Sequence, residues 1–380
     1  MASQLEANTA LGEVQDPELR RSIVDLGIIR SVAVDGDLAV IGIVPPLEDL
    51  GYRGALHGVI TEALVALEGI SRVEFTVTEP TPAELKAVAS RLRREPPPNP
   101  LAVTDASKPP PPRQRSNPFG SSNTRILAIA SGKGGVGKSS ITTNLAIALA
   151  QRGHSVAAVD ADVWGFSMPR MLGIHRPPET IDDLIIPPSA NGIRLISMGY
   201  FAREDQAVVW RGPMLHKALE QFLTDVYWDE PDYLLVDMPP GTGDVSLSIA
   251  QFLPRAEVIV VTTPQPAAQK VAQRAAAMAE KVDLKVIGVI ENMSWFRGDD
   301  GKSYEIFGEG GGDELATTLG VPLLAKIPLV PALRKGGDDG KPIIISHPED
   351  EASACFRAAA ERIDTDLAPR QIRRPELLIN

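Results

Sequence analysis

The chain has 380 residues, of which 43% are hydrophobic and 23% charged, so a wholly disordered, collagen-like or coiled-coil protein is excluded and about two domains are expected. Its net charge of -11 disfavours nucleic acid and anionic membranes as partners, because both would repel an acidic surface. The single cysteine, Cys355, excludes an internal disulfide and is typical of a reducing compartment. Neither a signal peptide nor an apolar run of about 18 residues is present, so we expect a cytoplasmic protein.

Residues 1–94 predict a small α+β domain. Alternating apolar residues on both sides of Asp35-Gly36 predict a β-hairpin, because this dipeptide favours a tight turn. The predicted elements are, in chain order, a strand over 28–34, a strand over 38–44, a helix over 52–67, a strand over 72–77 and a helix over 82–92.

Residues 95–122 differ sharply in composition from the chain on either side. They read EPPPNPLAVTDASKPPPPRQRSNPFGSS, and proline both fixes the backbone and lacks an N–H donor. We therefore expect an extended tether between two domains, with a proline-rich docking ligand as the less common alternative. At the other end of the chain, residues 369–380 are expected to form a solvated basic tail.

Residues 123–368 predict an α/β domain in which strands alternate with helices. Most of the strand-like runs are continuously apolar, as expected for parallel strands that are buried on both faces. The runs are 126–130, 156–159, 193–196, 233–236, 258–261, 286–290 and 323–327. A mainly parallel sheet covered by helices follows, and ligands of such sheets bind at the carboxyl ends of the strands.

The strongest local signal is GKGGVGKS, residues 132–139, which fits the phosphate-loop pattern G-x-x-x-x-G-K-[ST] between a predicted strand and a helix. Glycines let backbone N–H groups converge on phosphate oxygens, and the helix N-terminus adds partial positive charge. Lys138 would neutralise the β- and γ-phosphates of a nucleotide, and the Ser139 hydroxyl would ligate Mg²⁺. The residues expected to form this cradle are Gly132, Lys133, Gly134, Gly135, Val136, Gly137, Lys138, Ser139 and Ser140.

Carboxylates follow two other predicted strands of this domain. Asp237 ends the strand over 233–236 and is a candidate to support the metal ion. Asp160 and Asp162 follow the strand over 156–159, and one of them could orient an attacking water. A turn or helix-capping role remains open for each of them, as it does for Asp244 in the turn that follows Asp237. Lys133 is either solvated or reaches a phosphate bound to a neighbouring subunit.

Together these segments resemble the deviant phosphate-loop ATPases, the group that contains MinD, ParA and the nitrogenase iron protein. The resemblance depends on Lys133 in the loop, on DADVWGFSMPR from Asp160 and on DMPPGTGD from Asp237. A narrower resemblance, to the Mrp-type (ApbC) iron–sulfur cluster carriers with their fused small N-terminal domain, depends on longer segments. These are VQDPELRRSIVDLGII (14–29), VVWRGPMLHKALEQFL (208–223), TTPQ (262–265), ENMSWF (291–296) and FGEGGG (307–312).

The resemblance implies a homodimer that binds and hydrolyses ATP with Mg²⁺ and that passes iron–sulfur clusters to target proteins. Lys133 would cross the dimer interface to the partner's nucleotide, and Asp162 would position the attacking water. Asp237 would support Mg²⁺, Asn292 would read the adenine, and Pro328 would pack near the base. Read from the residues alone, Asn292 would be a turn-forming asparagine.

One part of the family pattern is missing. The family usually carries a C-x-x-C pair directly after ENMSYF, whereas this chain has Arg297–Gly301 there. The small domain often has a cysteine after its second strand, and this chain has Pro45–Asp49 in that region. Asp299 and Asp300 are hard oxygen ligands that we expect in a turn, and Cys355 is expected in a helix core. The ligands of any [4Fe-4S] cluster are therefore not evident.

Two functions remain open from the sequence. The first is a carrier that delivers clusters to apoproteins, and the second is a MinD- or ParA-type switch whose ATP-bound dimer recruits a partner protein. The missing C-x-x-C pair favours the switch, while the long motif matches and the fused N-terminal domain favour the carrier. A DNA-binding ATPase is disfavoured by the net charge of -11.

Overall fold

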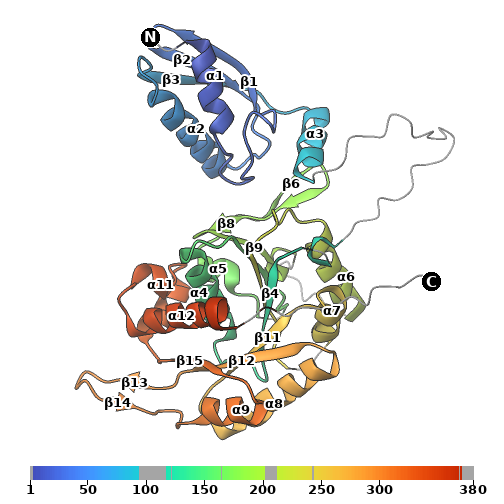
Figure 1. The fold of residues 1–380 in the computed structure, drawn as a ribbon, viewed down its shortest axis with the longest axis vertical. Coiled ribbons are helices and arrows are strands. Elements are labelled where there is room, and N and C mark those ends of the chain that lie inside the picture. The colour runs from blue at the N-terminus through green and yellow to red at the C-terminus, as the bar shows by residue number, and fades with distance from the viewer. Residues whose placement is uncertain are drawn as a thin grey trace, which may run out of the picture. The chain divides into compact units, whose positions relative to one another are not determined.

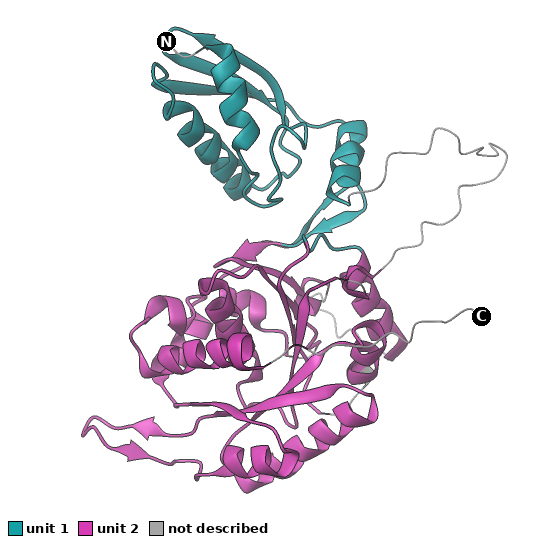
Figure 2. Ribbon diagram, viewed as in Figure 1, with its two compact units in different colours: residues 1–115, 178–187, 225–229 teal, residues 116–177, 188–224, 230–380 magenta. Residues whose placement is uncertain are grey.

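The protein is described by a computed structural model in which its residues fall into two compact units (Figure 2). Residues 3–93, 117–120, 122–163, 165–201, 212–241, 244–367 and 369 are described. Unit 1 comprises residues 1–115, 178–187 and 225–229, and unit 2 comprises residues 116–177, 188–224 and 230–380. The predicted tether and tail lie almost entirely outside the described residues.

Unit 1 contains the predicted small α+β fold. Its elements are α1 (Gln4–Glu13), β1 (Ile29–Asp35), β2 (Leu38–Ile43), α2 (Leu50–Val65), β3 (Arg72–Val77), α3 (Pro82–Leu92), β6 (Glu179–Ile181) and β7 (Leu184–Ile186). The predicted hairpin is confirmed, since β1 and β2 pair antiparallel, and β3 adds to β2 in parallel. Helix α1 was not predicted; a capping box between Ser3 and Glu6 begins it, and Ala7 and Leu11 bury its inner face.

Unit 1 also includes two segments that sequence reasoning had assigned to residues 123–368. Strands β6 and β7 form an antiparallel hairpin, and residue 185 forms a parallel bridge with residue 226. Three hydrophobic residues of the hairpin, Ile181, Leu184 and Ile186, and Tyr227 of the second segment belong to the same buried core as the N-terminal helices and strands. The core of unit 1 is therefore completed by residues far along the chain.

Unit 2 contains the predicted α/β fold. Its strands are β4 (Arg125–Ser131), β5 (Val156–Asp160), β8 (Ser189–Ala190), β9 (Ile193–Ser197), β10 (Tyr233–Asp237), β11 (Glu257–Thr262), β12 (Lys285–Asn292), β13 (Phe296–Arg297), β14 (Ser303–Tyr304) and β15 (Leu323–Ile327). Its helices are α4 (Lys138–Gln151), α5 (Met168–Leu172), α6 (Gly212–Thr224), α7 (Asp244–Phe252), α8 (Pro266–Lys281), α9 (Gly311–Leu319), α10 (Pro331–Asp338), α11 (Ile343–Ser346) and α12 (Glu351–Glu361). The short helical turns are η1 (Pro118–Gly120), η2 (Met198–Tyr200) and η3 (Arg362–Asp366).

An eight-stranded sheet organises unit 2, with the strand order β15-β12-β11-β4-β10-β5-β9-β8. Every strand predicted for this part of the chain is confirmed and lies in this sheet, and all neighbouring strands pair in parallel except β8, which runs antiparallel to β9. Strands β4, β5, β9, β10 and β11 are buried along their whole length, which explains why their sequences are mostly apolar.

Helices cover the sheet on two sides (Figure 1): α4, α5, α11 and α12 lie on one side, and α6, α7, α8 and α9 on the other. This arrangement makes a three-layer α/β fold with the parallel strands buried in the middle. None of the helices in the described ranges has the length and apolar character needed to cross a bilayer.

Candidate nucleotide site

The predicted site residues converge because parallel strands end at the same edge of a sheet. The phosphate loop follows the central strand β4, Asp237 ends the adjacent β10, and Asp160 ends β5, which is next in order. Asp237 and Asp160 are direct register partners. On the other side of β4, Asn292 ends β12 and pairs in register with residue 327 of β15, immediately before Pro328.

The shape of the phosphate loop requires glycine at more than one position. Gly137, which caps α4, has a φ of 82°, and an added Cβ would lie 2.3 Å from Asn292 Nδ2. A Cβ on Gly132 would lie 2.2 Å from the backbone carbon of Val271 in α8. No side chain of the described residues caps α4, so the N–H groups of its first turn face the loop, as a phosphate site requires.

A compact polar cluster joins the loop to β10. Lys138 Nζ forms an ion pair with Asp237 Oδ2 at 2.7 Å, and the Ser139 hydroxyl donates to the same oxygen at 2.6 Å. Thr142, which sequence reasoning missed, donates its hydroxyl to Asp237 Oδ1 at 2.6 Å. The side chains of Lys138 and Asp237 are 6% and 0% exposed, so the charges of this pair are almost completely removed from water.

Asp160 is a buried carboxylate beside this cluster. Burial, and then the charge of neighbouring Asp237, raise the pKa of Asp160 to about 7. Its Oδ2 accepts hydrogen bonds from the backbone amides of Ser167 and Met168, where α5 begins, and from the Ser197 hydroxyl at the end of β9. Of the roles left open by the sequence, the contacts of Asp160 are those of a residue that holds the start of α5.

Asp162 lies two residues beyond Asp160 and is 8% exposed. Its backbone amide donates to Asp160 Oδ1 at 3.3 Å, and its own Oδ1 accepts from the amide of Gly165 at 3.0 Å. The carboxylate therefore closes a short turn at the carboxyl end of β5. Trp164 and the side chain of Asp244 lie outside the described residues.

The second lysine of the loop, Lys133, is held by the chain itself. Its Nζ donates to Gln265 Oε1 at 3.2 Å, and Gln265 caps α8 on the side of β4 opposite Asp237. Gln265 belongs to the TTPQ segment, for which sequence reasoning gave no role.

Asn292 lies directly under the loop with its side chain 3% exposed. Its Nδ2 donates to the carbonyl oxygen of Val136 at 2.8 Å, while its Oδ1 is buried without a hydrogen-bond partner among the described residues. A buried acceptor without a donor is costly in a folded protein, and an amino group of a ligand would remove that cost. Pro328 is also buried at this edge of the sheet.

Glu291, the residue before Asn292, was also missed. Its carboxylate is 1% exposed and accepts from the backbone amide of Gly312 in the first turn of α9. A Cβ on Gly312 would lie 2.6 Å from the Glu291 Cβ, which explains the last glycine of FGEGGG. The negative charge at a helix N-terminus is stabilising, and here it attaches α9 to the strand that carries Asn292.

The segment in place of the family's C-x-x-C pair forms the predicted turn, between β13 and β14. Asp300 Oδ1 accepts from the amide of Lys302, and its Oδ2 accepts from the Tyr304 hydroxyl at 2.8 Å. Arg297 forms an ion pair with Glu351 at 3.0 Å. The contacts of Asp300 hold the turn together, and the Arg297–Glu351 pair attaches the hairpin to α12. None of these groups is a soft ligand suited to iron–sulfur chemistry.

Cys355 lies in α12, as predicted, and packs against the core of unit 2 while remaining partly exposed. Burial, together with the charges of Glu351 and Asp350, raises the pKa of its thiol, so the thiol form is favoured over the metal-binding thiolate. No group of three or more His, Cys, Asp or Glu side chains suited to a metal ion is found in the described ranges. The donor set of this chain therefore does not fit a cluster held by cysteines of a single subunit.

The fold and the loop define a class, the P-loop NTPases of the MinD type. A nucleotide-binding protein of Archaeoglobus fulgidus, solved in complex with ADP, is 32% identical with a TM-score of 0.52 and covers 61% of this chain and 91% of that chain. The MinD protein of Pyrococcus horikoshii, solved with Mg-ADP, is 26% identical with a TM-score of 0.50 and covers 64% of this chain and 96% of that chain.

Sequence comparison narrows the class to one family. The model described as NUBPL iron-transfer P-loop NTPase matches residues 122–364, and the chain belongs to this family. A second model, described as iron-sulfur cluster assembly protein, matches residues 6–77.

Relatives are similar over almost the whole chain. A Mycobacterium bovis protein named iron-sulfur cluster carrier protein is 42% identical over 367 residues, covering 94% of this chain and 92% of its own length. A Bacillus subtilis protein of the same name is 38% identical over 336 residues, covering 87% of this chain and 89% of its own length. The family resemblance inferred from the motifs is confirmed.

Proposed function

We propose that this protein is a Mg²⁺-dependent ATPase that works as a homodimer and carries iron–sulfur clusters to apoproteins. The observation that carries the nucleotide part is the cluster of Lys138, Ser139 and Asp237 at the end of a glycine loop whose helix N-terminus has no side-chain cap in the described chain. The family and the names of its relatives support the cargo.

The loop residues bind the polyphosphate. Backbone N–H groups of residues 132–140 surround the phosphate oxygens, and Lys138 exchanges the carboxylate of Asp237 for the β- and γ-phosphates. The unpartnered Asn292 Oδ1 accepts from the exocyclic amino group of adenine, which guanine does not offer at that position. Pro328 packs against the base.

The residues at the loop also fit a magnesium ion. Ser139 and Asp237 supply a hydroxyl and a carboxylate that already lie 2.6 Å apart, and Mg²⁺ prefers such oxygen ligands. When bound, the ion neutralises charge on the β- and γ-phosphates. The ion would also compensate the buried negative charge of Asp237 once Lys138 pairs with the phosphates.

Hydrolysis depends on positioning more than on covalent chemistry. Asp162 releases the amide of Gly165 and orients the attacking water. Lys133 releases Gln265 and reaches the nucleotide of the partner subunit, where its charge stabilises the transition state. Turnover therefore requires two subunits.

The cargo is the part that this chain cannot hold alone. One cysteine per subunit gives a homodimer two thiolates, whereas iron–sulfur clusters are usually held by four. The segment in place of the family's C-x-x-C pair is occupied by internal hydrogen bonds of Asp300. We therefore propose that a cysteine-bearing donor or recipient protein completes the ligand set during transfer.

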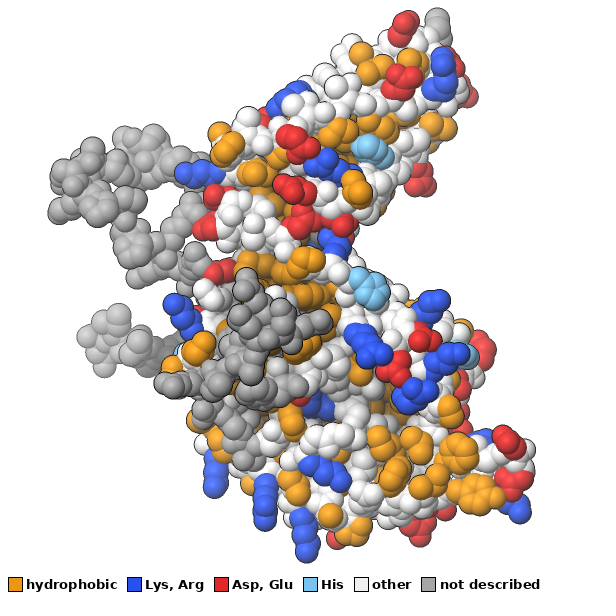
Figure 3. Space-filling model, turned by 180° about the vertical axis from the view of Figure 1, so that it is seen from behind, with side chains coloured by type: hydrophobic (Ala, Val, Ile, Leu, Met, Phe, Trp, Pro, Cys, Tyr) orange, Lys and Arg blue, Asp and Glu red, His pale blue; other side chains and the backbone are white. Residues whose placement is uncertain are grey.

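The missing C-x-x-C pair also favours a second candidate function, a nucleotide switch in which the ATP-bound dimer recruits a partner protein without a cluster. A DNA-binding ATPase has less support, because acidic and basic side chains are interspersed on the face drawn in Figure 3 and the net charge is -11.

Anaerobic reconstitution with iron and sulfide separates the first two functions. The protein is incubated alone, with a cysteine-bearing apoprotein, and with the same apoprotein after alkylation, and iron and sulfide are then counted on the isolated complex. The carrier function predicts a stoichiometric cluster that requires the free thiols of the apoprotein. ATP-dependent capture of a partner without any iron would instead establish the switch.

A further inference from the structure

We propose that the N-terminal fold, residues 3–93, responds to the nucleotide: occupancy of the phosphate loop changes how tightly this fold holds the β6–β7 hairpin. The proposal goes beyond the cargo and rests on the proposed function only in that ATP binds at the loop.

The first anchor of the hairpin is electrostatic. Both carboxylate oxygens of Glu179 accept backbone amides of the segment before α2, from Glu48 at 2.6 Å and from Asp49 at 3.3 Å. Arg93, directly after α3, pairs with Asp183 at 2.5 Å in the turn between β6 and β7. Glu179 thus reaches the segment in which the family's small domain usually carries its cysteine.

The second anchor is the segment 225–229. The Tyr227 hydroxyl lies 2.9 Å from the carbonyl oxygen of Leu19, and Arg21 pairs with Asp229 at 3.2 Å. Tyr227 is 5% exposed and shares the core of unit 1 with Ile181, which is fully buried. Apolar burial at this level makes the N-terminal fold and the two segments one cooperative body.

The β6–β7 hairpin is inserted between two segments of unit 2 that both contact Asp160. The chain leaves unit 2 after α5, whose first amides, those of Ser167 and Met168, donate to Asp160 Oδ2 at 3.1 and 3.2 Å. It returns through β8 to β9, whose last residue, Ser197, donates its hydroxyl to the same oxygen at 3.1 Å. One carboxylate oxygen of Asp160 therefore binds both the segment that precedes the hairpin and the segment that follows it.

Asp160 lies next to the groups that a nucleotide must rearrange. Its register partner, Asp237, binds Lys138 and Ser139, and both of these side chains belong to the phosphate loop. When phosphates attract Lys138, the balance of charge around Asp160 changes, because these groups are almost without solvent to screen them. The hydrogen bonds that Asp160 makes to α5 and Ser197 change strength in consequence.

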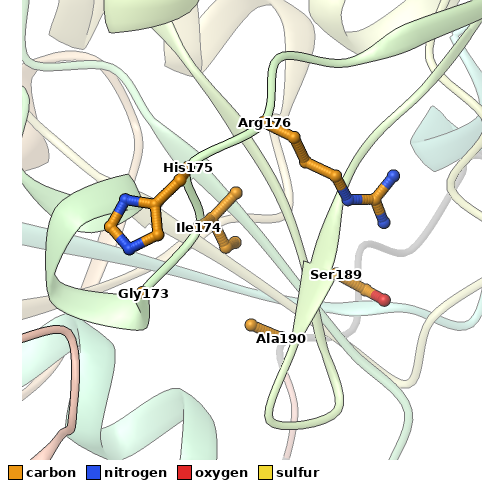
Figure 4. A pocket seen from close by; sticks show the side chains of 6 residues that line it. All are labelled: Gly173, Ile174, His175, Arg176, Ser189 and Ala190. Carbon is orange, nitrogen blue, oxygen red and sulfur yellow. The ribbon is translucent and has the colours of Figure 1, made fainter. Parts of the chain in front are cut away.

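The two connections of the hairpin have room to move. The segment after α5 and strand β8 line a cavity of about 310 Å³, and Figure 4 shows residues 173–176 on one side of it and Ser189 and Ala190 on the other. The pocket is open to solvent, so these connections are not packed against other side chains on that side, and a shift of them meets less resistance than it would in a close-packed interior. A displacement of α5 is therefore passed to the hairpin along the chain.

Amide hydrogen exchange of the full-length protein tests the proposal at named atoms. The amides of Glu48 and Asp49, which donate to Glu179, are followed with and without MgATP. We expect their exchange rates to change by about fivefold or more on nucleotide binding, the lower range of typical coupling between sites. The Lys138→Ala variant, which we expect to have lost ATP binding, should show no such change.

The reciprocal experiment measures ATP affinity after weakening the anchor. Glu179→Gln removes the charge but keeps one acceptor oxygen, and Glu68→Gln, an exposed carboxylate of unit 1 outside these contacts, is the matched control. Because coupling is reciprocal, the Kd for MgATP should change for Glu179→Gln by about the same factor and stay unchanged for Glu68→Gln. If ATP accelerates exchange at Glu48 and Asp49, ATP weakens the anchor, and Glu179→Gln must bind ATP more tightly than the wild type. If ATP slows this exchange, Glu179→Gln must bind ATP more weakly.

A charge swap between Arg93 and Asp183 distinguishes a loss of the anchor from unfolding of the variant. Arg93→Asp should alter the Kd for MgATP in the same direction as Glu179→Gln, and the double variant Arg93→Asp/Asp183→Arg should restore it. Unchanged exchange at Glu48 and Asp49 and an unchanged Kd in all anchor variants, measured while the wild type binds MgATP normally, would overturn the coupling and leave the proposed function intact. Absence of ATP binding in the wild type would instead refute the proposed function.

Discussion

Two buried ion pairs lie near opposite ends of the central strand β4, and their surroundings differ. At its amino end, Arg125 Nε pairs with Glu257 Oε2 of β11 at 2.7 Å, and Arg125 Nη1 also donates to the carbonyl oxygen of Ile363 at 2.5 Å. Beyond its carboxyl end, Lys138 pairs with Asp237 at 2.7 Å. All four side chains are at most 7% exposed.

The difference lies in what surrounds each pair. The pair Arg125–Glu257 joins two strands and the C-terminal turn η3. The pair Lys138–Asp237 lies beside an uncapped helix N-terminus, two hydroxyls and a second carboxylate, Asp160. We propose that the same type of contact is structural in the first setting and exchangeable in the second. Burial and distance alone do not distinguish the two pairs.

The largest expected effect comes from breaking the exchangeable pair. Lys138→Ala should abolish ATP binding and reduce turnover by about 10³-fold or more, because the loop loses the charge that faces the β- and γ-phosphates. Steady-state phosphate release and equilibrium nucleotide binding measure both effects, and circular dichroism checks the fold. Turnover at the wild-type rate in this variant would refute the assigned site.

The next effect separates binding from hydrolysis within the same loop. Lys133→Ala should keep nucleotide binding but lose about 10³-fold in turnover, as for charges that a partner subunit supplies in trans. Wild-type turnover per subunit should also rise with protein concentration as dimers form. The matched variant Gln265→Ala, which removes only the intramolecular partner of Lys133, should retain most of the activity. Turnover independent of both Lys133 and concentration would rule out the trans role.

Breaking the pair Arg125–Glu257 should lower the stability of the protein and leave its ATP affinity unchanged. Arg125→Met leaves Glu257 buried without its cation and should lower the free energy of unfolding by about 3–5 kcal/mol. Adding Glu257→Leu should recover most of that loss, because replacing both charges removes the uncompensated one. Urea denaturation measures the change, while ATP affinity per folded molecule should stay at the wild-type value. A lost affinity would show that the two ends of β4 are not separable.

The smallest effect concerns a surface cluster that fastens the C-terminal turn. Burial alone would raise the pKa of Asp364, but hydrogen bonds from His154, Arg152 and Tyr233 lower it to about 2. A lowered carboxyl pKa contributes stability above about pH 4 and loses it as the pH falls toward 2. Thermal melting over this window should show a smaller pH dependence for Asp364→Asn than for the wild type. Parallel curves would contradict the assignment.

The sequence was informative where structure is local. Strands buried on both faces are continuously apolar, so each strand predicted for residues 123–368 was found in the sheet. The phosphate loop was equally visible, because its glycines and Lys138 are contiguous and meet a fixed geometric need at Gly137. The turn at Asp300 was also predicted, because the residues that form it are contiguous in the chain.

What was missed is non-local. Glu291 reaches Gly312, Asp160 reaches Ser197, and Thr142 reaches Asp237, and no spacing in one segment shows such a contact in advance. The three-residue strands β6 and β7 are too short for a periodic pattern, so their place in unit 1 was not foreseen. Helix α1 did carry a signal, the capping box at Ser3, but its few apolar residues hid it.

The most direct test of the account is a calorimetric titration of the purified full-length protein with ATP in the presence of Mg²⁺. The account predicts saturable binding of one nucleotide per subunit, a weaker affinity for GTP, and no binding heat for Lys138→Ala. Absence of any saturable heat from the correctly folded wild type would contradict it.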